Sequence, residues 1–212
     1  MTISLSDAGK RYNRDWIFRH LNYTFEAGGS YAITGPNGSG KSTLLQVVGG
    51  VMLVNEGACE WVVDGKKIPP ENVFGHISIS APYLELVEEM TLREFLVFHS
   101  GFKPLLPGLQ PEGIAEMVGL KNALTKQIRN FSSGMKQRLK LAQCICSDIS
   151  VILLDEPCTN LDADGIALYH QLISNYGNDR MILVSSNDEV EYSFCKQKIN
   201  VMDYKGGGLT VA

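Results

Sequence analysis

Positions 35–43 of the chain read Gly-Pro-Asn-Gly-Ser-Gly-Lys-Ser-Thr, and this stretch constrains the fold more than any other. The order of residues fits G-x-x-x-x-G-K-[ST], in which glycines let the backbone pass close to a polyphosphate and turn its N–H groups inward. Residues 31–34 before it are mostly apolar and β-prone, and residues 44–48 after it carry an apolar helical face. A strand, a glycine-rich loop and a helix in this order predict a phosphate-binding loop.

The predicted loop supplies the groups that a bound nucleotide needs. Lys41 can reach the β- and γ-phosphates, and the Ser42 hydroxyl can ligate Mg²⁺. The helix that follows presents the positive end of its dipole to the anion. A glycine-rich turn that happens to carry a lysine is the alternative, and the flanking strand and helix argue against it. The residues expected to bind the phosphates are Gly35, Pro36, Asn37, Gly38, Ser39, Gly40, Lys41, Ser42 and Thr43.

Length and composition predict an ordinary globular protein. With 212 residues, the chain is long enough for one domain, or for one domain with an inserted lobe. The formal net charge of −4 provides no basic field that would favour nucleic acid, so no nucleic-acid partner is expected. The five cysteines are odd in number and lack C-x-x-C spacing, which favours reduced cytosolic thiols over disulfides or a zinc site.

We expect neither a membrane-spanning segment nor a secretory signal. No apolar run approaches the ~18–20 residues that a bilayer requires. The first seven residues lack a basic region followed by an apolar core. Any role at a membrane is therefore expected to depend on a partner.

Hydrophobic periodicity along the chain predicts an α/β fold. Continuous apolar runs at 151–154 and 181–184 are typical of strands buried on both faces. Further strands are expected at 2–6 (as a sheet edge), at 21–25, at 60–63 before a hairpin turn at Asp64-Gly65, at 77–80, and as two short strands within 199–209 around the glycines at 206–208. Helical patterns start at Thr91, with Glu94 at the capping-box position, near Ile114 and at Ser132, so a helical lobe is predicted at about 86–147.

Two carboxylates follow the apolar run at 151–154. Asp155 ends the predicted strand, where a carboxylate can hold Mg²⁺ beside a phosphate loop, directly or through water. Glu156 comes next, so its side chain points to the other face and can orient a water for in-line attack on a γ-phosphate. Solvated acids at an ordinary strand exit are the alternative, which the phosphate loop upstream disfavours.

Two further stretches distinguish among nucleotide-hydrolysing families. Residues 131–138, Phe-Ser-Ser-Gly-Met-Lys-Gln-Arg, resemble the Leu-Ser-Gly-Gly-Gln signature of ABC ATPases. Residues 158–162, Cys-Thr-Asn-Leu-Asp, resemble the D-loop that follows the catalytic glutamate in that family. The resemblance covers essentially the whole chain. It implies a single ABC-type domain over 1–212, with a P-loop NTPase core at 1–85 and 148–212, an antiparallel β arm, and the inserted helical lobe at 86–147.

The resemblance implies an ATPase subunit of an ABC transporter, which sandwiches ATP and Mg²⁺ in a homodimer or with a paired ABC subunit. Tyr12 sits at about the spacing of the aromatic residue that stacks on adenine, with Trp16 as the competitor. Ser132 and Gly134 would meet the γ-phosphate held on the opposite subunit, although Ser132 could also be a helix N-cap. Asp162 would join the two sites across the dimer. The subunit would lie at the cytoplasmic face of the membrane, held there by an integral-membrane transporter subunit.

The sequence departs from the family pattern at three places. The family glutamine after the strand at 77–80 is replaced by Ala81 and Pro82, which offer no side-chain hydrogen bond, and nearby Glu85 is a weak substitute. The switch histidine is replaced by Asn187, which can donate to a γ-phosphate oxygen but cannot carry a proton. The signature carries Ser133 and Met135 in place of glycine and glutamine.

Glu156 and Asn187 are therefore the expected catalytic residues, and hydrolysis is expected to be slower or more partner-dependent than with the full motifs. The alternative is a degenerate ATP-gated dimerisation module with little or no hydrolysis. A soluble ABC protein acting on nucleic acid is disfavoured, because such proteins usually carry two cassettes or long coiled coils. The stretch 84–89, with three apolar and three acidic residues, is a candidate docking surface for the membrane subunit, unless its leucines pack inward.

Overall fold

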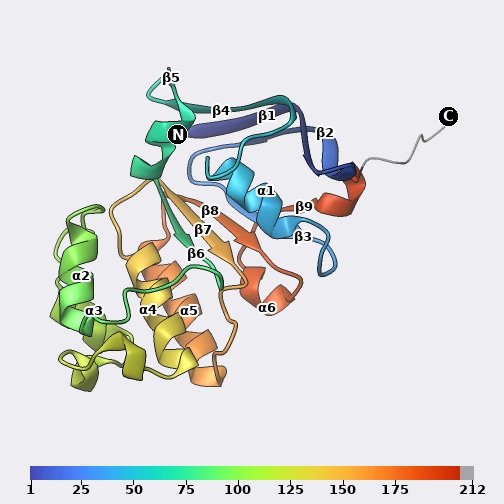
Figure 1. Ribbon diagram of the computed structural model, residues 1–212. Helices are drawn as coiled ribbons and strands as arrows, with labels where there is room; N and C mark the ends of the chain where they lie inside the picture. Colours follow the sequence, from blue (N-terminus) through green and yellow to red (C-terminus); the bar gives the residue numbers. More distant parts are fainter. Residues whose placement is uncertain (206–212) are drawn as a thin grey trace.

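The computed structural model describes residues 1–205, which form two β-sheets and a set of helices (Figure 1). The first sheet is antiparallel and the second is parallel. The antiparallel sheet has the order β2 (Asp15–Phe25), β1 (Thr2–Tyr12), β4 (Glu56–Val63) and β5 (Lys66–Ile68). The parallel sheet has the order β6 (Ile77–Ser80), β7 (Val151–Asp155), β8 (Met181–Ser185), β3 (Ser30–Thr34) and β9 (Gln197–Asn200).

The parallel sheet separates two hydrophobic cores. All residues of β7 and β8 are buried, as their continuous apolar runs predict. Val151 and Leu153 pack with α1 (Lys41–Val48) and the antiparallel sheet, so that α1 lies between the two sheets (Figure 1). Ile152 and Leu154 pack on the other face with α4 (Ser133–Ile145) and α5 (Ala163–Tyr176). Burial on both faces holds the carboxyl ends of these strands in place for the site.

The expectation that residues 2–6 form an edge strand is wrong. β1 lies between β2 and β4, and it continues through the basic and aromatic stretch to Tyr12. The register of β1 with both neighbours is irregular, which interrupts the alternation of its side chains. Apolar and polar residues therefore alternate only in the first part of the strand. The hairpin turn is confirmed: Asp64 and Gly65 both adopt positive φ, at 50° and 75°, between β4 and β5.

Helices α2 (Leu92–Ser100), α3 (Pro111–Met117) and α4 lie between β6 and β7 in the chain, on one side of the parallel sheet (Figure 1). The capping box at the start of α2 is confirmed, since the Glu94 carboxylate accepts from the Thr91 backbone N–H at 2.8 Å and the Glu94 N–H donates to the Thr91 hydroxyl at 3.3 Å. These helices share one continuous core with β7, β8 and α5. The lobe boundaries at 86 and 147 remain a prediction.

The C-terminal segment differs in part from the predicted pair of strands. β9 ends at Asn200, whose side chain accepts from the Met202 N–H at 3.1 Å and starts a 3₁₀ turn over Val201–Tyr204. The second predicted strand, beyond Gly206, lies outside the described residues. Within residues 1–205, no helix combines the length and apolarity needed to cross a membrane.

Candidate functional site

The loop between β3 and α1 has backbone conformations that glycine favours. Gly35, Gly38 and Gly40 have φ values of 143°, 75° and 105°. A Cβ on Gly40 would also lie 2.1 Å from Cγ2 of Ile17. The conformation of this loop therefore depends on glycine at position 40, which is also the residue that precedes α1.

Lys41 and Ser39 turn their polar groups into this loop. The Lys41 ammonium donates to the carbonyl oxygens of Gly35 at 3.0 Å and Pro36 at 3.3 Å, and the residue is only 5% exposed. Ser39 is 2% exposed, and its hydroxyl has no hydrogen-bond partner among residues 1–205. A buried, unpaired hydroxyl costs free energy unless a ligand accepts or donates to it. Both groups suit an anion bound within the loop.

A cavity of about 340 Å³ opens beside the loop. Its lining brings together residues from three separate parts of the sequence. They are Tyr12, Ile17, Asn37, Gly38, Gly40, Lys41, Ser42, Thr43 and Glu156. Trp16, the competitor of Tyr12, is not part of this lining, and the guanidinium groups of Arg11 and Arg19 lie 5.4 and 4.5 Å from the centre of its ring.

The two carboxylates take different positions at the end of β7. Asp155 is 2% exposed, and one of its oxygens accepts a 2.6 Å hydrogen bond from the Ser185 hydroxyl on β8. Glu156 adopts φ 44° and its N–H donates to the Ser185 carbonyl at 2.9 Å, which turns its side chain into the cavity lining. Among residues 1–205, no group of three or more His, Cys, Asp or Glu side chains could hold a metal. A hydroxyl, a carboxylate and substrate phosphates are nevertheless the usual ligand set of Mg²⁺.

Asn187 lies next to the phosphate loop. Its amide Nδ2 donates to Oδ1 of Asn37 at 3.4 Å, and the N–H of Ser186 beside it donates to the Ile33 carbonyl of β3 at 3.1 Å. The loop after β8 is thereby tied to the phosphate-loop strand. An amide at this position can donate to an anion in the loop, as the sequence suggested.

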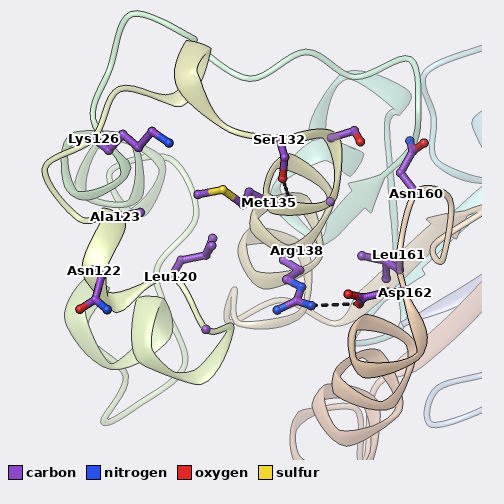
Figure 2. A pocket seen from close by; sticks show the side chains of 13 residues that line it. Leu120, Asn122, Ala123, Lys126, Ser132, Met135, Arg138, Asn160, Leu161 and Asp162 are labelled. Carbon is purple, nitrogen blue, oxygen red and sulfur yellow. Dashed lines mark hydrogen bonds and ion pairs between the residues drawn. The ribbon is translucent and has the colours of Figure 1, made fainter.

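Ser132, Gly134 and Asp162 line a second cavity, of about 600 Å³, which does not include the phosphate loop (Figure 2). Ser132 is the N-cap of α4, and its hydroxyl accepts from the Met135 N–H at 3.2 Å. Asp162 is the N-cap of α5 and accepts from the Gly165 N–H at 2.8 Å and from Arg138 at 3.1 Å. Within one chain these residues therefore do not reach the Lys41 cavity.

A lysine on α4 holds the main chain at Ala81 and Pro82. Lys140 on α4 donates to the carbonyl oxygens of Ala81 at 3.3 Å and Pro82 at 3.1 Å. Tyr83, which no motif in the sequence indicates, lies near Asp155. Burial raises the pKa of the Tyr83 phenol, and the Asp155 charge adds to this shift, whereas a hydrogen bond with Gln46 opposes it. The exposed Glu85 contributes to the field at Lys140, where its charge raises the pKa of the ammonium against burial.

The candidate docking stretch packs partly inward. Leu86 is buried, and the Glu88 carboxylate pairs with Lys136 on α4. Val87 is 39% exposed and Tyr83 is 49% exposed, so the apolar surface here is smaller than the sequence pattern indicated. The alternative that the leucines pack inward holds for Leu86.

Comparisons with known proteins show which family the chain is similar to. The sequence model of the ABC transporter family matches residues 18–159. An uncharacterized ABC transporter ATP-binding protein of Bacillus subtilis, YhcH, is 31% identical over 87% of this chain, which spans only 61% of that relative. An energy-coupling factor transporter ATP-binding protein of Thermotoga maritima is 30% identical over 91% of this chain and 74% of its own length.

Solved structures show the same fold. The ATP-binding subunit of an ABC transporter covers 99% of this chain and 96% of its own, with a TM-score of 0.80 at 20% identity. A dimeric ATP-binding cassette bound to ADP and phosphate covers 93% of both chains, with a TM-score of 0.77 at 21% identity. The matched family model and the arrangement of two sheets and helices together show that this chain belongs to the ABC transporter family.

Proposed function

We propose that this chain is the ATP-hydrolysing subunit of an ABC transporter, which dimerises on ATP and drives a separate integral-membrane subunit. The observation that carries this proposal is the cavity where Glu156 and the phosphate loop meet. ATP would place its phosphates against Lys41 and the loop N–H groups, with its adenine toward Tyr12. The relatives support this assignment, because their names describe ATP-binding proteins of transporters.

Mg²⁺ fits at the end of β7. The Ser42 hydroxyl and the Asp155 carboxylate would hold it, and bound Mg²⁺ would neutralise charge that develops on the phosphates. Ser185 keeps one Asp155 oxygen hydrogen-bonded and so fixes the orientation of the carboxylate. Glu156 would accept a proton from the attacking water, and Asn187 would donate to the γ-phosphate.

Dimerisation would complete the site. Ser132 and Gly134 line a cavity separate from the one that Lys41 lines. A second copy or a paired ABC subunit would therefore have to place its own Ser132 cavity against the γ-phosphate bound at Lys41. The solved dimeric cassette supports this arrangement for a protein of the same fold. The membrane subunit would contact the exposed part of residues 81–89, at Tyr83 and Val87.

The experiment that tests the proposal combines two measurements on the purified chain with Mg²⁺ and ATP. Phosphate release would report hydrolysis, and light scattering coupled to size exclusion would report the mass. We expect phosphate release above background and a shift from monomer to dimer with ATP but not with ADP. Absence of both changes would contradict the proposal, and a dimer without phosphate release would support the ATP-gated module instead.

Replacing Asn187 with histidine is expected to raise turnover. Asn187 already reaches Asn37 of the phosphate loop, and an imidazolium there can donate a stronger, charge-assisted bond to the developing negative charge. Phosphate release by Asn187→His would be compared with the parent and with the double variant that adds Pro82→Gln. Equal turnover in all three would show that neither replaced residue limits the rate.

A further inference from the structure

Glu191 is a buried carboxylate on α6 (Glu189–Tyr192), directly behind the loop that carries Glu156. The residue is 5% exposed. Its Oε1 accepts a 2.7 Å hydrogen bond from the backbone N–H of Cys158, two residues after Glu156. A carboxylate that accepts a main-chain N–H in a buried place fixes the position of that stretch of chain.

Helix α4 holds the same stretch through a second hydrogen bond. Gln137 on α4 is buried, and its amide Nε2 donates to the Pro157 carbonyl at 2.7 Å. Two consecutive residues after Glu156 are thus bonded in opposite directions, Pro157 to α4 and Cys158 to α6. The peptide unit between Pro157 and Cys158 is therefore fixed relative to both helices.

Glu191 is also connected to the loop that carries Asn187, because α6 begins directly after its N-cap Asp188. Burial raises the pKa of the Glu191 carboxyl, and the Ser186 hydroxyl lowers it. Ser186 is 1% exposed, and its hydroxyl accepts from the Asp188 N–H at 2.9 Å on the other side of Asn187. Glu191 therefore bonds through its side chain to the loop that carries Glu156, and its helix directly continues the loop that carries Asn187.

The side chain of Glu191 is not what attaches α6 to the rest of the fold. The Tyr169 hydroxyl on α5 donates to the main-chain carbonyl of Glu191 at 2.7 Å, and Tyr192 beside it is 8% exposed within the core. Neither of these contacts involves the Glu191 side chain. The carboxylate thus contributes chiefly to the two loops.

A carboxylate is a costly choice at this position. Burial raises the pKa of Glu191, and the charges of Asp188 and Glu156 raise it further, whereas Ser186 and the Cys158 N–H lower it. Burial raises the pKa values of Cys158 and Tyr169, and the charge of Glu191 adds to both shifts. The hydrogen bond from the Cys158 N–H offsets part of this cost, and it is the contact by which the side chain holds the Glu156 loop.

We propose that Glu191 is a positioning residue for hydrolysis, which holds the Glu156 loop and the Asn187 loop in one fixed arrangement. The inference rests on the proposed ATPase function, and it adds a residue that touches neither nucleotide nor metal. Through Gln137 and Pro157, the same arrangement extends to the helix that starts at Ser132.

The test compares Glu191→Ala and Glu191→Gln with the parent protein, below the melting temperature of each. Glutamine keeps the oxygen that accepts from Cys158, and alanine removes it. We expect Glu191→Ala to lower kcat by about tenfold, as the loss of one charge-assisted hydrogen bond permits, while KM for ATP changes less than about twofold. Glu191→Gln should restore kcat to within about threefold of the parent.

Hydrogen exchange followed by mass spectrometry supplies a second readout that does not need turnover. In Glu191→Ala, peptides covering 156–162 and 185–188 should exchange faster together, and in Glu191→Gln both should stay close to the parent. Glu189→Ala is the matched control, because Glu189 lies on the same helix, is exposed and pairs only with Lys198 among the described residues.

Three outcomes would overturn the inference: an unchanged kcat in Glu191→Ala, a loss of kcat equal in the alanine and glutamine variants, or faster exchange confined to one loop. A parent that releases no phosphate would instead contradict the proposed function. In that case the exchange readout still decides whether Glu191 joins the two loops.

Discussion

Replacement of Glu156 with glutamine is expected to lower ATP hydrolysis by ~10²-fold or more while ATP still binds. Glutamine keeps the size and hydrogen bonding of the side chain but loses the carboxylate charge that accepts the water proton. The backbone should not respond, because the Glu156 N–H bond to Ser185 and the φ of 44° belong to the main chain. ATP-bound dimers should therefore accumulate.

The measurement is phosphate release under saturating ATP, together with the mass of the complex. Glu60→Gln is a suitable control, because Glu60 lies on β4 away from the cavity and pairs with the exposed Lys67. A Glu156→Gln variant that hydrolyses ATP like the parent would remove Glu156 from the mechanism and leave the water to another group.

Replacement of Lys41 with alanine is expected to weaken ATP binding by ~100-fold or more, which corresponds to the loss of about 3 kcal/mol of charge-assisted contacts. The lysine is buried within the loop and bonds only to the Gly35 and Pro36 carbonyls among the described residues. Since these partners belong to the ligand site rather than to either core, the fold should persist.

Titration with a fluorescent ATP analogue measures this change, and circular dichroism checks that the variant is folded. Lys66→Ala on β5 serves as the control, because it removes one exposed lysine far from the loop in the sequence and outside both cavities. Unchanged affinity in a folded Lys41→Ala variant would refute the assignment of the phosphate loop.

Local signals in the sequence predicted the parts of the fold that local physics determines. The β3–loop–α1 unit follows from glycine spacing and flanking apolar residues, and α2 follows from a capping box that the structure confirms. The buried strands β7 and β8 follow from uninterrupted apolar runs. None of these features depends on what lies far away in the sequence.

Features that depend on distant partners were missed or misjudged. The central place of β1 results from its pairing with β4, about 50 residues later, which no alternation in β1 reveals. Helix α5 was not predicted, although Asp162 is its N-cap, because that residue was interpreted only through the family resemblance. The buried Leu86 and the approach of Tyr83 to Asp155 likewise depend on packing across the fold.

The candidate site shows the same division. The sequence identified Lys41, Asp155 and Glu156 from motifs, and the structure places Lys41 and Glu156 in one cavity lining. The contact of Asn187 with Asn37 joins residues about 150 positions apart. The sequence motif could therefore suggest a role for Asn187, but not how close its side chain lies to the phosphate loop. Glu191 carries no motif signal in the sequence, and only its buried hydrogen bonds distinguish it from the exposed Glu189 on the same helix.

Phosphate release by the purified parent chain, measured beside Lys41→Ala and Glu156→Gln with Mg²⁺ and ATP, tests the central claim most directly. We predict steady release by the parent, strongly reduced release for Lys41→Ala because ATP binds ~100-fold or more weakly, and a long-lived ATP-bound dimer with release lowered by ~10²-fold or more for Glu156→Gln. If the parent releases no phosphate and Glu156→Gln changes neither turnover nor dimer lifetime, the chain is not an ATPase, and nucleotide serves only to bring two subunits together.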